Sequence, residues 1–164
     1  MPASRRDYIL TLIDQLGELL AQAIAKRKKT PLTGTAQAHQ ALQSVIQSCE
    51  RLFGLEGAQL FQFTPDQHIA MLADGEAPEV ARDKILLYSA LCAEAGEVYA
   101  TLGKPAVAQQ SRLNALRLTL RARSEFPGGD LPLFAVEPAE LLAALKGVPL
   151  DPETKQLVDR YSPP

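Results

Sequence analysis

The residues best suited to bind an anion lie between positions 112 and 123, where four arginines occur. At helical spacing, Asn114, Arg117 and Arg121 share one side of a helix, whereas Arg112 points nearly opposite to Arg121. This side could form an anion or RNA groove. The alternative is a solvated helix face whose long side chains cover apolar surface. The second interpretation is favoured, and nucleic acid is not expected as a partner, because no aromatic residues alternate with the arginines.

A second group of cations, Lys26-Arg27-Lys28-Lys29, stands where an apolar helical pattern ends. One interpretation is a patch that binds an anionic ligand. The other is that the cations interact with the negative end of the helix dipole and keep the last turn hydrated. The sequence favours the second interpretation, because basic residues in the last turn of a helix are common for this reason alone.

Catalytic and metal-binding signals are weak. His39 and His68 have no cysteine or carboxylate partners at zinc spacing, so we expect surface or capping roles for both. Cys49 and Cys92 fall within apolar helical patterns, which predicts buried free thiols and no disulfide. The chain has no Gly-x-Ser-x-Gly motif, phosphate loop or dinucleotide fingerprint. We therefore expect no enzymatic activity, no cofactor and no metal.

The composition fits one helical domain. The chain has 164 residues, of which 46% are hydrophobic and only 5% aromatic, and its net charge is −2. Such a balance gives no global field toward nucleic acid or anionic lipid. No window reaches the ~18 apolar residues of a membrane span, and the N-terminus does not resemble a secretory signal. A cytoplasmic protein is the expected result.

Apolar residues recur at three- and four-residue steps along most of the chain, which predicts an all-α fold with about six to eight helices. The first two form a pair over about 5–53, with Thr33 or Thr35 as the cap of the second helix. Thr64-Pro65-Asp66-Gln67 predicts a capped start of another helix that ends at Gly75. A long hairpin over about 80–124 turns at Gly103, and short helices over about 137–161 cap the domain.

Within this hairpin, the run that starts Leu-Cys-Ala-Glu-Ala-Gly at Leu91 resembles the tetratricopeptide repeat, and the resemblance covers about a fifth of the chain. With Ser89 as the first repeat position, the signature positions are Gly96, Tyr99, Gly103, Ala108 and Ala115. Cys92, Arg112 and Leu120 depart from the pattern, which indicates a degenerate repeat. The resemblance implies antiparallel helical hairpins stacked as an α-α superhelix.

Two further segments are similar to a bacterial family of uncharacterised helical proteins. They are the opening Arg6-Asp7-Tyr8-Ile9 with Gln15-Leu16, and the later run from Pro149 to Thr154. This second resemblance also implies a tetratricopeptide-like fold, and it carries no activity with it.

The best-known function of such repeats is to hold a carboxylate tail with basic residues on the inner face. The corresponding positions here are Ala93 and Glu97, with Glu94 beside them, so this face would repel a carboxylate. The two glutamates either meet a basic partner or form a solvated or internally paired helix face. The candidate partner-binding face consists of Ala93, Glu94, Glu97, Ala100 and Thr101.

The leading hypothesis is a protein-interaction or scaffold domain whose helix faces bind an unknown polypeptide or a second copy of the chain. A homodimer is expected if the end helices leave an apolar face uncovered. The alternative is a domain that senses a small molecule or nucleotide. It would use Asn114, Arg117 and Arg121 together with the segment 127–136 as a pocket.

Overall fold

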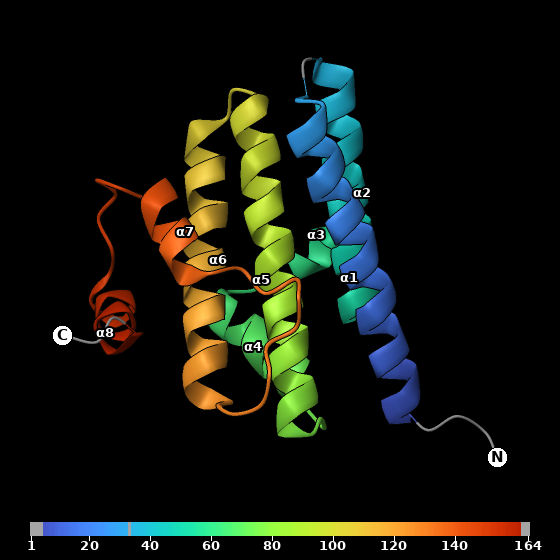
Figure 1. The fold of residues 1–164 in the computed structure, drawn as a ribbon, viewed down its shortest axis with the longest axis vertical. Helices are drawn as coiled ribbons and strands as arrows, with labels where there is room; N and C mark the ends of the chain where they lie inside the picture. The colour runs from blue at the N-terminus through green and yellow to red at the C-terminus, as the bar shows by residue number, and fades with distance from the viewer. Residues whose placement is uncertain (1–4, 33, 162–164) are drawn as a thin grey trace.

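The computed structural model describes residues 5–32 and 34–161, and within them it contains eight α-helices and no strand (Figure 1). The all-α prediction is therefore confirmed. The helices are α1 (Arg5–Lys29), α2 (Thr35–Phe53), α3 (Gly57–Leu60), α4 (Pro65–Ala73), α5 (Pro78–Thr101), α6 (Pro105–Glu125), α7 (Pro138–Ala144) and α8 (Pro152–Tyr161).

Helix α5 is the central element of the molecule. Between Val80 and Leu91 only Asp83 is not buried, which is unusual for a helix and means that this part of α5 is covered on every side. Helices α1, α2, α4 and α6 all contact it.

Helices α5 and α6 form the hairpin that the sequence predicts. Gly103 adopts a left-handed φ of 72°, and Pro105 is the first residue of α6. The two helices approach closely at Gly96, where an added Cβ would lie 3.3 Å from the carbonyl oxygen of Ala108. The hairpin is confirmed, whereas its tetratricopeptide-type packing stays a prediction.

Helices α1 and α2 run antiparallel on one flank of α5 (Figure 1). Their buried side chains join a single hydrophobic core with α5. Gly34 caps α2 without any side-chain hydrogen bond, so the prediction that Thr35 caps this helix is wrong. Thr35 is already helical, because the chain enters the helix through the extended backbone of Gly34. The other predicted cap, Thr33, lies outside the described residues.

Helix α4 starts as the sequence predicts. Thr64 accepts a hydrogen bond from the Gln67 N–H, and Gln67 accepts one from the Thr64 N–H. Gly75 follows the helix with a φ of 71°. The short helix α3 just before this cap was not predicted, because its four residues are too few for any periodic signal.

The segment after α6 crosses α5 and then leads into α7 (Figure 1). Arg82 holds its first part by donating hydrogen bonds to the carbonyl oxygens of Gly128 and Asp130. Farther along, Phe134 packs on Gly17 of α1, where an added Cβ would lie 2.8 Å from its ring. Helices α7 and α8 pack against α6 through a second, smaller apolar cluster. None of the described helices has the length and apolar character that crossing a membrane requires.

Candidate functional site

The predicted partner-binding face lies on the second half of α5, and its central carboxylate is already occupied. Glu94 is only 4% exposed and accepts two hydrogen bonds from Arg27 of α1, both 2.8 Å long. This is a bidentate ion pair, the strongest geometry available to a guanidinium and a carboxylate. The bond to Glu94 is the main cause that raises the pKa of Arg27.

Glu97 extends the same network to α6. Its carboxylate accepts a hydrogen bond from Arg112 at 3.2 Å and lies 3.9 Å from Arg27. Two arginines and two glutamates thus connect α1, α5 and α6 at this level. Of the two interpretations of these glutamates, the structure has the internally paired one. A basic partner would have to compete with Arg27 and Arg112.

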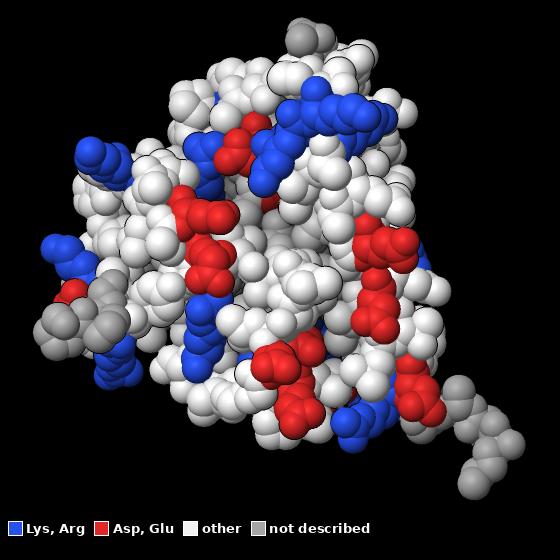
Figure 2. Space-filling view, viewed as in Figure 1, with Lys and Arg blue, Asp and Glu red and all other residues white. Residues whose placement is uncertain are grey.

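The residues of the predicted face do not form one continuous surface. Ala93, Glu94 and Glu97 line a cavity of about 260 Å³ between the end of α1, α5, α6 and α7. Figure 2 shows this hollowed white surface with basic groups above it and acidic groups along its edge. Ala100 lines a separate cavity beside α7, and the hydroxyl of Thr101 donates to the Glu97 carbonyl of its own helix.

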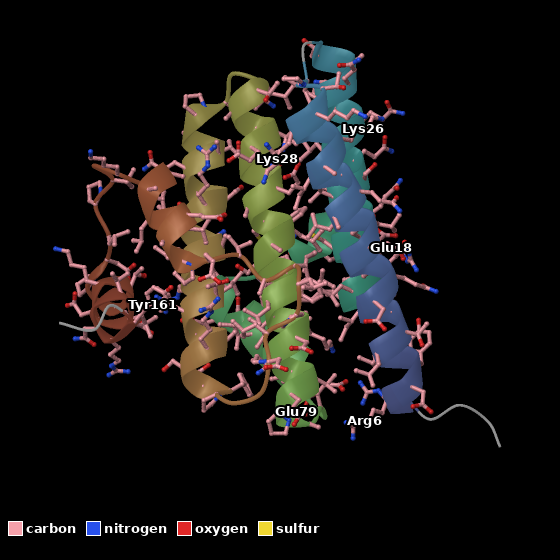
Figure 3. The ribbon with its side chains drawn as sticks, viewed as in Figure 1. Arg6, Glu18, Lys26, Lys28, Glu79 and Tyr161 are labelled. Carbon is pink, nitrogen blue, oxygen red and sulfur yellow. The ribbon has the colours of Figure 1, made fainter. Side chains whose placement is uncertain are left out.

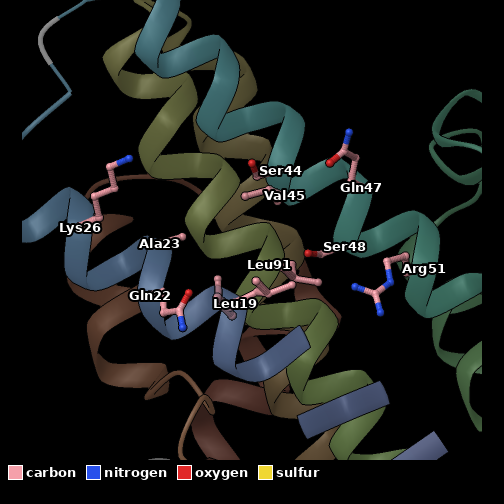
Figure 4. Close-up of a pocket in the computed structure, with 11 residues that line it drawn as sticks. Leu19, Gln22, Ala23, Lys26, Ser44, Val45, Gln47, Ser48, Arg51 and Leu91 are labelled. Atoms are coloured by element: carbon pink, nitrogen blue, oxygen red, sulfur yellow. The ribbon is translucent and has the colours of Figure 1, made fainter. Parts of the chain in front are cut away.

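A longer groove, which the sequence did not predict, lies between α1 and α2 (Figure 4). It consists of two cavities of about 370 and 340 Å³ that share Ala23, Lys26, Ser44 and Val45. We call this the α1–α2 groove. Buried apolar side chains from three helices form its floor: Leu20, Val45 and Leu91. Leu19 stands on its edge and is 48% exposed.

The ion pair between Arg27 and Glu94 separates this groove from the cavity at Ala93 and Glu97. Both partners of the pair line both spaces. The neighbouring cations point to different sides, because Lys26 lies toward α2 and Lys28 extends over α5 (Figure 3). Neither lysine forms an ion pair within the part of the chain that the structure describes.

The predicted anion-binding residues of α6 are engaged by carboxylates. Asp66 of α4 accepts hydrogen bonds from Arg117 at 3.0 and 3.1 Å and from Arg121 at 2.7 Å. Glu153 of α8 also pairs with Arg117, at 2.8 Å. Burial lowers the pKa of Arg117, but the bonds to Glu153 and Asp66 outweigh it and leave the pKa raised. Asn114 accepts a hydrogen bond from Gln110.

A cavity of about 510 Å³ adjoins this cluster, but its charge does not suit an anion. Three carboxylates line it, from Asp66, Glu125 and Glu153, against the two guanidinium groups of Arg121 and Arg160. Arg121 is itself paired with Asp66 and Glu125. A phosphate would have to displace these internal partners before it could bind Arg121.

His68 contradicts the expected surface or capping role, since it is 4% exposed. Its ring packs edge-on against Phe53 and Tyr88, and its Nε2 lies 2.8 Å from the Leu60 carbonyl oxygen. Burial is the main cause that lowers the pKa of His68. Because α4 is amphipathic, position 68 falls on its inner face with Ile69 and Leu72.

Both cysteines are free thiols, as predicted, but only Cys49 is buried, whereas Cys92 is half-buried. Burial raises the pKa of Cys49 and raises that of Cys92 to about 12, which disfavours the thiolate form of both. Among residues 5–32 and 34–161, no group of three or more His, Cys, Asp or Glu side chains is placed to hold a metal ion.

No family model, curated protein or solved structure matches the chain. The tetratricopeptide resemblance and the bacterial-family resemblance therefore stay predictions. Sequence reasoning missed Arg27 and Asp66 as partners of the predicted residues. One signal for Arg27 was present, because it continues the buried stripe of α1 after Leu20 and Ile24.

Proposed function

We propose that the chain is a protein-interaction domain that binds a polypeptide segment in the α1–α2 groove. The observation that supports this proposal is the groove itself, with its apolar floor and the exposed Leu19 on its edge. Its walls are two long helices whose backbone groups are already hydrogen-bonded, so recognition would depend on side chains. A partner helix laid between them would repeat the packing of a helical bundle.

The groove also has the rigidity that such binding needs. Both walls rest on the buried helix α5, and the pair between Arg27 and Glu94 ties the end of α1 to it. A preformed groove loses little conformational entropy when a partner binds. The proposal retains a second copy of the chain as one possible partner, and it retains the cytoplasmic location expected from the sequence.

Site-specific photo-crosslinking tests the proposal. A benzophenone amino acid at Gln22, which lines the groove, should give discrete crosslinked products in cells that naturally produce the chain. The same group at Lys155, an exposed position on α8, is the control. Leu19→Asp should abolish the Gln22 products by placing a charge on the apolar edge. Equal products at both positions, or none at Gln22, would contradict the proposal.

Light scattering separates the two kinds of partner. Products that contain only a second copy of the chain should be accompanied by a dimer mass at micromolar concentration, and Leu19→Asp should shift that mass to the monomer. The small-molecule alternative is not carried further, because carboxylates already engage Arg117 and Arg121.

A further inference from the structure

The charges around the α1–α2 groove are unbalanced. Among the described residues that line it, the cations are Lys26, Arg27 and Arg51, and Glu94 is the one acid. Both oxygens of Glu94 are engaged by Arg27. Arg51 donates a 3.3 Å hydrogen bond to the neutral side chain of Gln15, and Lys26 forms no ion pair in the described part of the chain. Two positive charges of this groove therefore lack an acidic partner.

These two cations stand on opposite walls of the groove and at opposite ends of its first cavity, the one of about 370 Å³. Lys26 belongs to α1 and Arg51 to α2, with the apolar floor between them (Figure 4). Arg51 is hydrogen-bonded to Gln15 and lines the same cavity as Leu19, and these two positions lie eleven and seven residues before Lys26 on α1. At a rise of about 1.5 Å per residue, the two cations are separated by roughly 10–16 Å along the groove. This separation equals two to three turns of a helix.

We infer that the groove receives an acidic amphipathic helix of a partner protein. The inference rests on the proposed function and names the chemistry of its partner. Such a helix would place an apolar stripe over Leu20, Val45 and Leu91. It would carry Asp or Glu on both flanks, two to three turns apart, to meet Lys26 and Arg51. Charges on the rim of an interface mainly set orientation and partner choice, while the apolar stripe provides most of the affinity.

Nucleic acid and an extended peptide fit the same surface less well. The described lining residues include no aromatic side chain on which a base could stack. An extended peptide relies on an open strand edge or on hydrogen bonds from the receptor, whereas a helix satisfies its own backbone groups. A straight trough between two helices supplies mainly side-chain contacts, which suits a helix.

Selection from a display library of random 18-residue peptides against the full chain tests the inference. Enriched peptides should carry apolar residues at three- and four-residue steps with acids seven to eleven residues apart. Synthetic copies should bind the chain measurably by fluorescence anisotropy. Binding should weaken about tenfold or more to the charge-reversed variant Lys26→Glu/Arg51→Glu. The matched control, Lys146→Glu/Lys155→Glu, changes the net charge equally at exposed C-terminal positions and should bind as the parent does.

The possible failures are distinguishable. Selected peptides that lack acids, or that bind both double variants equally, would overturn the acidic helix and leave the proposed function intact. Peptides that bind in the groove without gaining helical circular dichroism would overturn the helical form. If no peptide is enriched, both the inference and the groove's proposed role fail. Dodecanoate is titrated in parallel, and binding of this fatty acid that depends on Lys26 and Arg51, without peptide binding, would identify a lipid site instead.

Discussion

The cationic cluster of α6 and the cationic end of α1 look alike in the sequence but have different environments in the fold. Arg117 and Arg121 share the carboxylate of Asp66 and gain further acids from α8 and from their own helix. At the end of α1, Arg27 alone is paired, while Lys26 and Lys28 have no acidic partner within the described residues. Groups committed to internal pairs maintain the structure, and groups left unpaired remain available to a ligand.

The largest expected change in stability is the one that distinguishes the paired Arg27 from the unpaired Lys28 on α1. Arg27→Ala leaves Glu94 buried without its partner and should lower the free energy of unfolding by about 2–3 kcal/mol. Lys28→Ala on the same turn should change it by less than about 0.5 kcal/mol. Urea unfolding measures both. Arg27→Met combined with Glu94→Leu should recover most of the loss, because it removes the unpaired charge. If the two alanine variants lower the free energy of unfolding equally, the ion pair of Arg27 does not stabilise the fold more than the unpaired Lys28 does.

Asp66→Asn tests whether the ion pairs of Arg117 and Arg121 with Asp66 stabilise the fold. It removes the charge that two arginines share, and it also removes an acid from the first turn of α4. The free energy of unfolding should fall by about 1–2 kcal/mol at low salt, and the loss should shrink in 1 M NaCl. Asp159→Asn on α8, an exposed acid outside the cluster, is the control. If both variants match the parent, the Asp66 carboxylate does not stabilise the fold through Arg117 and Arg121, and the role assigned to Asp66 is wrong.

The local elements could be predicted because their signals lie within a few residues. Gly103 with Pro105 marked the hairpin, and the Thr64-to-Gln67 box marked the start of α4. The partners of the charged residues could not be predicted in this way. Arg27 and Glu94 are 67 residues apart, and Asp66 and Arg117 are 51 apart. These pairs form only when the helices pack, and helical spacing says which residues share a face but not what meets that face.

The α1–α2 groove escaped prediction for the same reason. Leu19 and Val45 read as ordinary members of two apolar stripes. Whether two stripes close on each other or stay apart over a third helix depends on side-chain volumes across all three. His68 is a further example, since its burial follows from the ring contacts with Phe53 and Tyr88 of two other helices.

Helix α4 carries His68 as well as Asp66, and burial of His68 should make the stability of the fold depend on pH. Burial lowers the pKa of His68 below its ordinary 6.5. The unfolded chain therefore binds a proton more readily than the folded one. The contribution of neutral, buried His68 to the free energy of unfolding is fully present above about pH 6.5. It is lost as the pH falls from there through the pKa of His68 in the folded chain. Unfolding in urea at pH 7.5 and 5.5 should show this loss in the parent, a smaller loss in His68→Gln, and the parental loss in His39→Gln. If His68→Gln loses as much stability between pH 7.5 and 5.5 as the parent does, the loss does not come from His68.

The smallest expected effect is the most informative for the groove. Lys26→Ala with Arg51→Ala removes two exposed charges that have no acidic partner in the described chain, so little internal energy is lost. Lys26 contributes only its weak interaction with the end of the α1 dipole. The free energy of unfolding should stay within about 0.5 kcal/mol of the parent. A loss above about 1 kcal/mol would mean that these cations serve the fold, as Arg117 and Arg121 do. Neutrality in stability, combined with weaker binding of selected peptides, would show that the α1–α2 groove keeps its charge for a partner.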